Sequence, residues 1–235
     1  MAYIYEHIRT RGVEPLNFEE HYLRLDAVMN RLFYTHLNIS REELRSRIRR
    51  ELQSRNYVSS AINAVCVKID PLDSNIYIDI EEIYYEAFSV RAIRPGGYIC
   101  NMGGELIMER TSARDALIDI NRTMAQITDG DAAIWTDSEG TIQAIDGASV
   151  IAVFEDEIRF AASGNGVEFD LAYNAMLETP YTVTRGTLSI DELSYAKEVM
   201  GIDHRGIVVL ESFNGHYYID LTAIKIALRV AEVEG

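Results

Sequence analysis

The sequence predicts an α/β (α+β) protein of two domains, the second of them rich in β-strands. Three observations support this: strand-like and helix-like segments alternate along the chain, Gly and Pro residues interrupt the pattern near its middle, and strands outnumber helices afterwards. A chain of 235 residues with 48% hydrophobic and 25% charged residues has the composition of a folded globular protein. We therefore expect an N-terminal α/β domain at 1–98, a linker at 99–104 and a C-terminal domain at 105–235.

The first predicted domain contains strands and two helices. A capping-box pattern begins each helix. In this pattern a side chain that can accept a hydrogen bond from a backbone N–H is followed three residues later by Glu. The first helix has Asn17 and Glu20 in these places, and the second has Ser40 and Glu43. The strands are expected where apolar and polar side chains alternate, or where β-branched and aromatic residues gather, at 2–9, 61–69, 76–86 and 86–93.

The second predicted domain opens with a helix over residues 112–127 and is then mostly strands. Its expected strands lie at 132–137, 141–145, 150–156, 157–163, 181–185 and 206–212. A helix ending near Leu177, a short helix from Ser189 and a final helix from Asp220 to Val233 complete the pattern.

Charge and hydropathy restrict the partners. The 37 acidic and 22 basic residues give a net charge of -15, which repels nucleic acid and anionic lipid. No apolar stretch approaches the roughly 20 residues that a membrane-spanning helix needs. No leader sequence opens the chain and only two cysteines occur, so we expect a cytoplasmic protein.

No metal site is predicted. The acidic run from Asp70 to Glu81 lacks the glycine of a calcium-binding loop, and the alternation of a strand explains it better. The spacing typical of zinc ligands is absent as well.

Four segments, taken in order, resemble the class IV aminotransferases. These are the fold-type IV pyridoxal phosphate (PLP) enzymes, which include branched-chain and D-amino acid aminotransferases and aminodeoxychorismate lyase. Residues 5–25 resemble the opening of the family, with its His-x-x-Arg-Leu motif at His21, Arg24 and Leu25. Residues 129–143 resemble the segment with the Asp-x-x-Gly turn of the family, here Asp137 and Gly140. Residues 166–193 resemble the segment with its Gly-Ile-Thr-Arg helix, and residues 196–216 resemble the segment before its last helix.

This resemblance implies the two-domain D-amino acid aminotransferase-like fold, a homodimer, and PLP bound between the domains of each subunit. It assigns cofactor binding to Arg24, the one intact phosphate contact of the family, and to the backbone N–H groups of the helix that begins at Gly166 and Val167.

Other positions depart from the pattern of the family. Arg110 or Thr111 stands at the place of the Schiff-base lysine, and Ala144 stands where a glutamate pairs with the pyridine nitrogen. Glu168 and Phe169 replace a threonine and an arginine of the phosphate site. A guanidinium stays protonated and is a poor amine nucleophile, so no catalytic residue can be assigned.

The chain has only three lysines, Lys68, Lys197 and Lys225, and Lys68 is the least implausible substitute amine. The sequence therefore leaves three hypotheses. The favoured one is a divergent class IV aminotransferase-like protein that lacks the Schiff-base lysine and keeps an interdomain cleft for a small anionic ligand. The alternatives are an active PLP-dependent aminotransferase or lyase, and a structural or partner-binding subunit.

Overall fold

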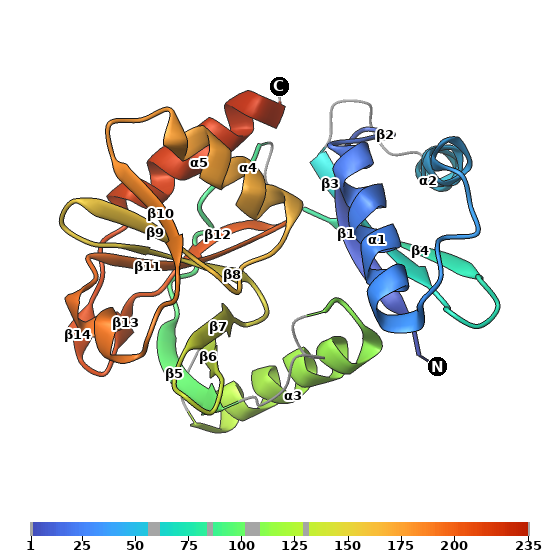
Figure 1. The fold of residues 1–235 in the computed structure, drawn as a ribbon. Coiled ribbons are helices and arrows are strands. Elements are labelled where there is room, and N and C mark those ends of the chain that lie inside the picture. The colour runs from blue at the N-terminus through green and yellow to red at the C-terminus, as the bar shows by residue number, and fades with distance from the viewer. Residues whose placement is uncertain (1, 56–61, 84–86, 102–108, 129–131, 235) are drawn as a thin grey trace. The chain divides into compact units, whose positions relative to one another are not determined.

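The computed structural model describes the whole chain except residues 1, 56–61, 84–86, 102–108, 129–131 and 235 (Figure 1). Contacts divide the chain into two units. Unit 1 comprises residues 1–87, 109–113 and 234, and unit 2 comprises 88–108, 114–233 and 235. The domain boundary that the sequence suggests at 99–104 stays a prediction. Part of that stretch belongs to β5 (Gly96–Asn101).

Unit 1 is built on a four-stranded antiparallel sheet in the order β2-β1-β3-β4. Its strands are β1 (Ile4–Arg11), β2 (Glu14–Pro15), β3 (Ile62–Ile69) and β4 (Ile76–Glu82). Side chains alternate between the two faces, so Ile4 and Ile8 of β1 lie on one face with Val65 and Val67 of β3. This face carries the apolar core of the unit.

Two helices, α1 (Phe18–Phe33) and α2 (Arg41–Ser54), cover that face (Figure 1). Ser40 begins α2 as expected, because its side chain accepts the N–H of Glu43. The capping box expected for α1 is wrong. Asn17 has a left-handed backbone with φ of 47° and makes no side-chain cap, because a turn rather than an extended residue leads into this helix.

Unit 2 contains two five-stranded sheets, in the orders β10-β9-β8-β11-β12 and β14-β13-β5-β6-β7. The first consists of β8 (Ser149–Val153), β9 (Glu157–Ala161), β10 (Thr182–Gly186), β11 (Glu198–Asp203) and β12 (Gly206–Val209). The second consists of β5, β6 (Ala132–Thr136), β7 (Ile142–Ile145), β13 (Ser212–Phe213) and β14 (His216–Tyr217).

Three apolar clusters hold unit 2 together as layers. The first packs α4 (Val167–Leu177) and α5 (Leu221–Glu234) on the β8–β12 sheet, and the second fills the space between the two sheets. The third lies on the other face of the second sheet, where Trp135 and Ala144 pack near Ile118 of α3 (Ser112–Thr128). The expectation of a β-rich second half is confirmed.

Three local expectations need correction. Residues 86–93 do not form a strand in their described part, where only Val90 makes an isolated bridge to Ile207. β11 was not expected, because five of its six residues are buried and it shows no polar alternation. The short helix begins at Asp191 and is a 3-10 helix. None of the described helices is long and apolar enough to span a membrane.

Candidate functional site

The most strongly charged buried cluster in the described part of unit 1 is centred on Glu6. This residue lies between Ile4 and Ile8 on the helix-covered face of β1, and only 3% of its side chain is exposed. His21 Nδ1 lies 2.9 Å from Glu6 Oε1, and Arg110 Nη1 donates to the same oxygen at 2.6 Å. Arg24 Nε is more distant, at 3.9 Å. One carboxylate oxygen is therefore approached by three nitrogen-bearing side chains.

Local structure explains why these residues meet. His21 and Arg24 are three residues apart on α1 and so lie on the same side of that helix. Arg110 comes from a segment held beside β1 by backbone hydrogen bonds, in which Tyr5 N donates to Arg110 O and Thr111 forms a bridge with Ile4. The segment thus behaves as part of unit 1, although it follows strand β5 of unit 2 in the chain.

The electrostatics of the cluster keep Glu6 ionised. Burial by itself would raise the pKa of Glu6, but the charge of Arg110, the hydrogen bond from His21 and the charge of Arg24 together lower it to about 2. The carboxylate is therefore negative at neutral pH and acts as the counter-ion of the surrounding bases.

Among the described residues of the cluster, Glu6 is the carboxylate that faces both guanidinium groups. Two guanidinium groups, those of Arg24 and Arg110, face one carboxylate, and both stay protonated at accessible pH. Arg24 makes no hydrogen bond within the described part of the chain, and 26% of its side chain is exposed. Its guanidinium can therefore donate to an anion from solution.

The N-terminus of α4 in unit 2 holds the other two residues expected to bind the cofactor. Gly166 has a φ of 140°, a conformation that favours glycine, and Val167 begins the helix. Glu168 follows, 2% exposed, and neither of its carboxylate oxygens has a hydrogen-bond partner among the described residues. A carboxylate here opposes the binding of an anion at this helix end. Anion binding by Gly166 and Val167 stays a prediction.

Two further positions that the resemblance singled out are buried in unit 2. Ala144, on β7, is 1% exposed and packs with Ala133 and Trp135. Phe169 lies in the core beneath α4, edge-on to Phe160. Neither side chain offers a charge or a hydrogen bond, so neither can pair with a polar ligand group.

Lys68 lies on the sheet face opposite Glu6. Lys68 is on β3, directly opposite Tyr5 of β1, and its ammonium group donates to Asp79 Oδ2 at 2.8 Å. That hydrogen bond is the main reason why the pKa of Lys68 is raised. An amine nucleophile must be unprotonated, so this environment disfavours imine chemistry at Lys68.

A depression of about 580 Å³ in unit 1 is lined by residues after α1 and in the β3–β4 turn, among them Tyr34, His36 and Leu72. It contains none of the residues of the Glu6 cluster. Because its one histidine, His36, already lies within hydrogen-bond distance of Asp26, with Nδ1 2.9 Å from Oδ2, the chemistry of the charged cluster is the better guide to function.

Sequence reasoning missed Glu6, which is the centre of the cluster. The signal was present, because Glu6 alternates with Ile4 and Ile8 and a carboxylate on an otherwise apolar strand face must find partners. His21, which the sequence marks only as part of the His-x-x-Arg-Leu motif, is one of those partners.

Structure comparison finds the same fold in solved aminotransferases and in a putative aminodeoxychorismate lyase. A putative 4-amino-4-deoxychorismate lyase from Legionella pneumophila matches with a TM-score of 0.81 and 13% identity, over 99% of this chain and 91% of that one. A branched-chain aminotransferase from Thermoproteus uzoniensis, solved with norvaline, also has a TM-score of 0.81 at 13% identity, over 99% and 85%. A hypothetical aminotransferase from Mycobacterium tuberculosis in its PLP-bound form has a TM-score of 0.77 at 10% identity, over 99% and 90%.

The chain therefore has the fold of the class IV aminotransferases and aminodeoxychorismate lyase, as the sequence predicts. No family model and no curated protein sequence matches it.

Proposed function

We propose that this protein is a divergent, non-catalytic relative of the class IV aminotransferases that binds a small anionic ligand through Arg24. One observation carries the proposal. The Arg24 guanidinium is partly exposed and makes no hydrogen bond to a described residue, and among the described residues of the cluster it shares the Glu6 carboxylate with Arg110. A phosphate or carboxylate group suits the planar donors of such a side chain.

The residues present do not fit PLP bound as an internal imine. Arg110 has no free amine and is held by Glu6, Ala144 has no carboxylate for the ring nitrogen, and Glu168 places a buried carboxyl group at the helix end expected to hold the phosphate. These features support a non-covalent ligand, and no transamination step is assigned to this chain. The homodimer and the cytoplasmic location stay predictions.

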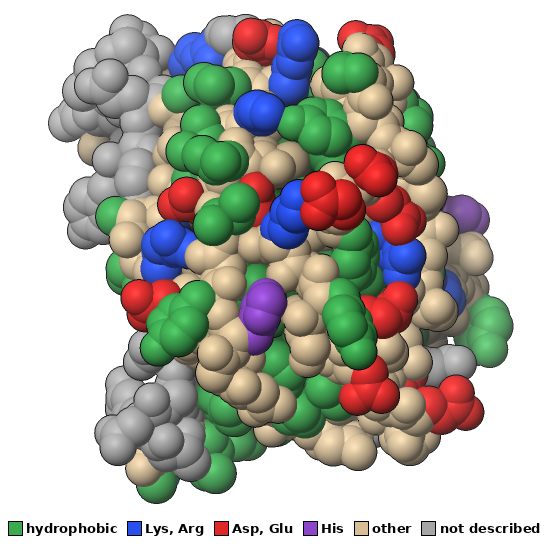
Figure 2. Space-filling view, turned by 90° about the vertical axis from the view of Figure 1, so that its left-hand side faces the viewer, with side chains coloured by type: hydrophobic (Ala, Val, Ile, Leu, Met, Phe, Trp, Pro, Cys, Tyr) green, Lys and Arg blue, Asp and Glu red, His purple; other side chains and the backbone are tan. Residues whose placement is uncertain are grey.

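The structural or partner-binding alternative would need a surface that recruits a basic partner. On the side of the molecule that is at the left in Figure 1, Asp and Glu side chains are interspersed with Lys, Arg and apolar ones (Figure 2). A mixed surface of this kind does not favour recruitment by charge alone.

Thermal unfolding in a phosphate-free buffer tests the proposal. We expect inorganic phosphate, PLP or a small dicarboxylate to raise the melting temperature, by an amount corresponding to about 2.7 kcal/mol at a concentration 100 times its Kd. Arg24→Ala should abolish this increase, because it removes the donor to the anion. The unliganded stability should change by less than about 1 kcal/mol, because the Arg24 ion pair is long and partly exposed.

Arg47→Ala is the matched control, because Arg47 is an exposed arginine whose ion pair is with Glu43 on α2. It should leave the ligand-dependent increase unchanged. If no phosphate or carboxylate compound stabilises the protein, or if Arg24→Ala responds like the unmodified chain, the proposal is wrong.

A further inference from the structure

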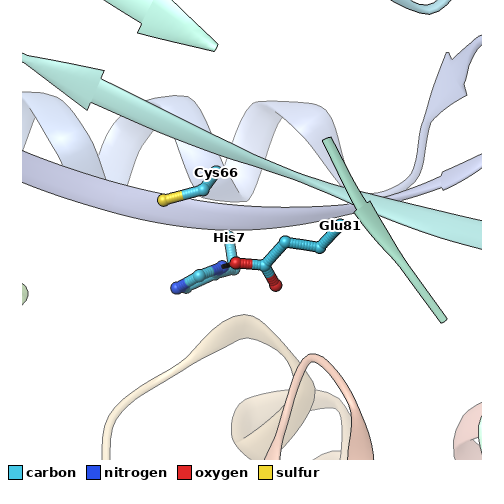
Figure 3. A group of neighbouring side chains, drawn as sticks. All are labelled: His7, Cys66 and Glu81. Carbon is cyan, nitrogen blue, oxygen red and sulfur yellow. Dashed lines mark ion pairs between the residues drawn. The ribbon is translucent and has the colours of Figure 1, made fainter. Parts of the chain in front are cut away.

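A second polar cluster lies on the opposite face of the unit 1 sheet from Glu6 and does not depend on the proposed function. His7, next to Glu6 in β1, points to this face because neighbouring strand residues alternate. Cys66 of β3 is paired directly across from His7, and Glu81 of β4 is paired with Ala64, two residues along β3 from Cys66. Figure 3 shows the three side chains side by side, each from a different adjacent strand.

The donor atoms are close enough to share one ion. One nitrogen of His7, the sulfur of Cys66 and one oxygen of Glu81 all lie within 4.8 Å of one another. His7 Nδ1 and Glu81 Oε1 are 3.3 Å apart. In tetrahedral coordination with metal–ligand bonds of about 2.0–2.1 Å, a nitrogen and an oxygen ligand lie about 3.3–3.4 Å apart. The distance between His7 Nδ1 and Glu81 Oε1 therefore already suits two ligands of one ion.

The sulfur needs only a small adjustment. With a zinc–sulfur bond of about 2.3 Å, the sulfur would lie about 3.6 Å from each of the other ligands. The sulfur now lies within 4.8 Å of the other two atoms, and a side-chain rotation of Cys66 or Glu81 can supply a difference of up to about 1.2 Å. The ring of His7 is held edge-on by Tyr5, with 5.3 Å between ring centroids, so one ligand is already oriented.

The donor set selects the kind of metal. Thiolate, imidazole and carboxylate together suit a borderline divalent cation such as Zn²⁺, whereas Ca²⁺ and Mg²⁺ prefer oxygen ligands alone. A thiolate and a carboxylate carry two negative charges, which a divalent cation neutralises. Lys68, on the same face, has its own counter-ion in Asp79.

Burial leaves a path for an ion. Cys66 is 3% exposed, but the side chains of His7 and Glu81 are 17% and 40% exposed. A cation can therefore enter beside Glu81 and reach the thiol beneath it.

We propose that His7, Cys66 and Glu81 form a binding site for one divalent transition-metal ion of the zinc type. The three protein ligands leave a fourth position for water or another small ligand. This departs from the sequence-based expectation that the chain has no metal site.

Metal titration of the purified, metal-free protein tests the site. We expect one Zn²⁺ to bind per chain, and Co²⁺ in its place to produce the near-ultraviolet absorption of a thiolate-to-cobalt charge transfer. Cys66→Ser should abolish that absorption and weaken Zn²⁺ binding by more than about 100-fold, because it removes a direct ligand.

Glu81→Gln keeps the test valid if Cys66→Ser does not fold, because Glu81 is half exposed. This variant should weaken Zn²⁺ binding at least about tenfold while the thiolate absorption of Co²⁺ persists. Cys100→Ser is the matched control and should bind both metals unchanged, since Cys100 lies in unit 2 and donates to Asn121 Oδ1 at 3.3 Å.

Two results would overturn the inference. One is a stoichiometry well below one Zn²⁺ per chain. The other is binding that Cys66→Ser and Glu81→Gln leave unchanged. In either case His7 and Glu81 would form a simple ion pair beside a buried thiol.

Discussion

Replacing Glu6 by glutamine is expected to destabilise the fold by about 3–5 kcal/mol. Glutamine has nearly the same shape, so the change removes the charge and leaves packing largely intact. Arg110, 12% exposed, and the buried His21 would then face a neutral amide, and the guanidinium would lose its buried counter-ion. Urea unfolding followed by circular dichroism measures this loss as a lower midpoint with an unchanged slope.

Glu19→Gln provides the control. Glu19 lies on the same helix as His21, pairs with Arg41 and Arg45, and is 46% exposed. Its loss should cost less than about 1 kcal/mol, because exposed ion pairs contribute little. Equal effects of Glu6→Gln and Glu19→Gln would mean that the Glu6 cluster is not a buried charge network.

Acid should remove the same contribution in the unmodified protein. The pKa of Glu6 is about 2 in the folded chain, against 4.5 for an unperturbed glutamate. Because the pKa of Glu6 is lower in the folded chain than in the unfolded chain, its ionised form stabilises the fold. This contribution to the free energy of unfolding is fully present above pH 4.5 and is lost as the pH falls towards 2. The amount is about 3 kcal/mol, because each pH unit between the two values corresponds to about 1.4 kcal/mol.

The measurement is the free energy of unfolding at several pH values between 6 and 2. Other carboxylates with lowered pKa values, such as Asp26 and Glu157, contribute to the same slope, so the comparison with Glu6→Gln isolates Glu6. The variant should lose less stability on acidification than the unmodified protein. Identical pH dependence in both proteins would show that the pKa of Glu6 is not lowered by folding.

Much of the secondary structure could be predicted because it follows from local patterns. The alternation in β1 and the Ser40 cap of α2 are properties of a few neighbouring residues, and the structure contains both. β11 could not be recognised in this way, because a central strand is buried on both faces and has no polar side to mark it. β5 was not recognised because Gly96 and Gly97 are typical of a linker. In the structure Gly97 lies against β6, where a β-carbon would be only 2.8 Å from the side chain of Ile134.

The charged sites could not be predicted from local patterns, because they bring together residues that are far apart in the sequence. The sequence resemblance points to Arg24 and Arg110, but their common partner Glu6 lies on a third segment, and only the folded chain brings the three together. The pairing of His7 with Cys66 depends on strand register. A shift of one residue would send one of these side chains to the other face, and register is set by the whole sheet.

By the sequence resemblance, we propose that a guanidinium bound to a buried carboxylate, that of Arg110 on Glu6, stands at the position where class IV aminotransferases carry their imine-forming lysine. Absorbance spectra with added PLP, before and after borohydride reduction and followed by peptide mapping, test it most directly. We predict no stoichiometric pyridoxyl adduct on Lys68, Lys197 or Lys225, because none of these lysines belongs to the Glu6 cluster. One equivalent of reduced cofactor on any single lysine, Lys68 above all, would contradict the claim and restore the enzyme hypothesis.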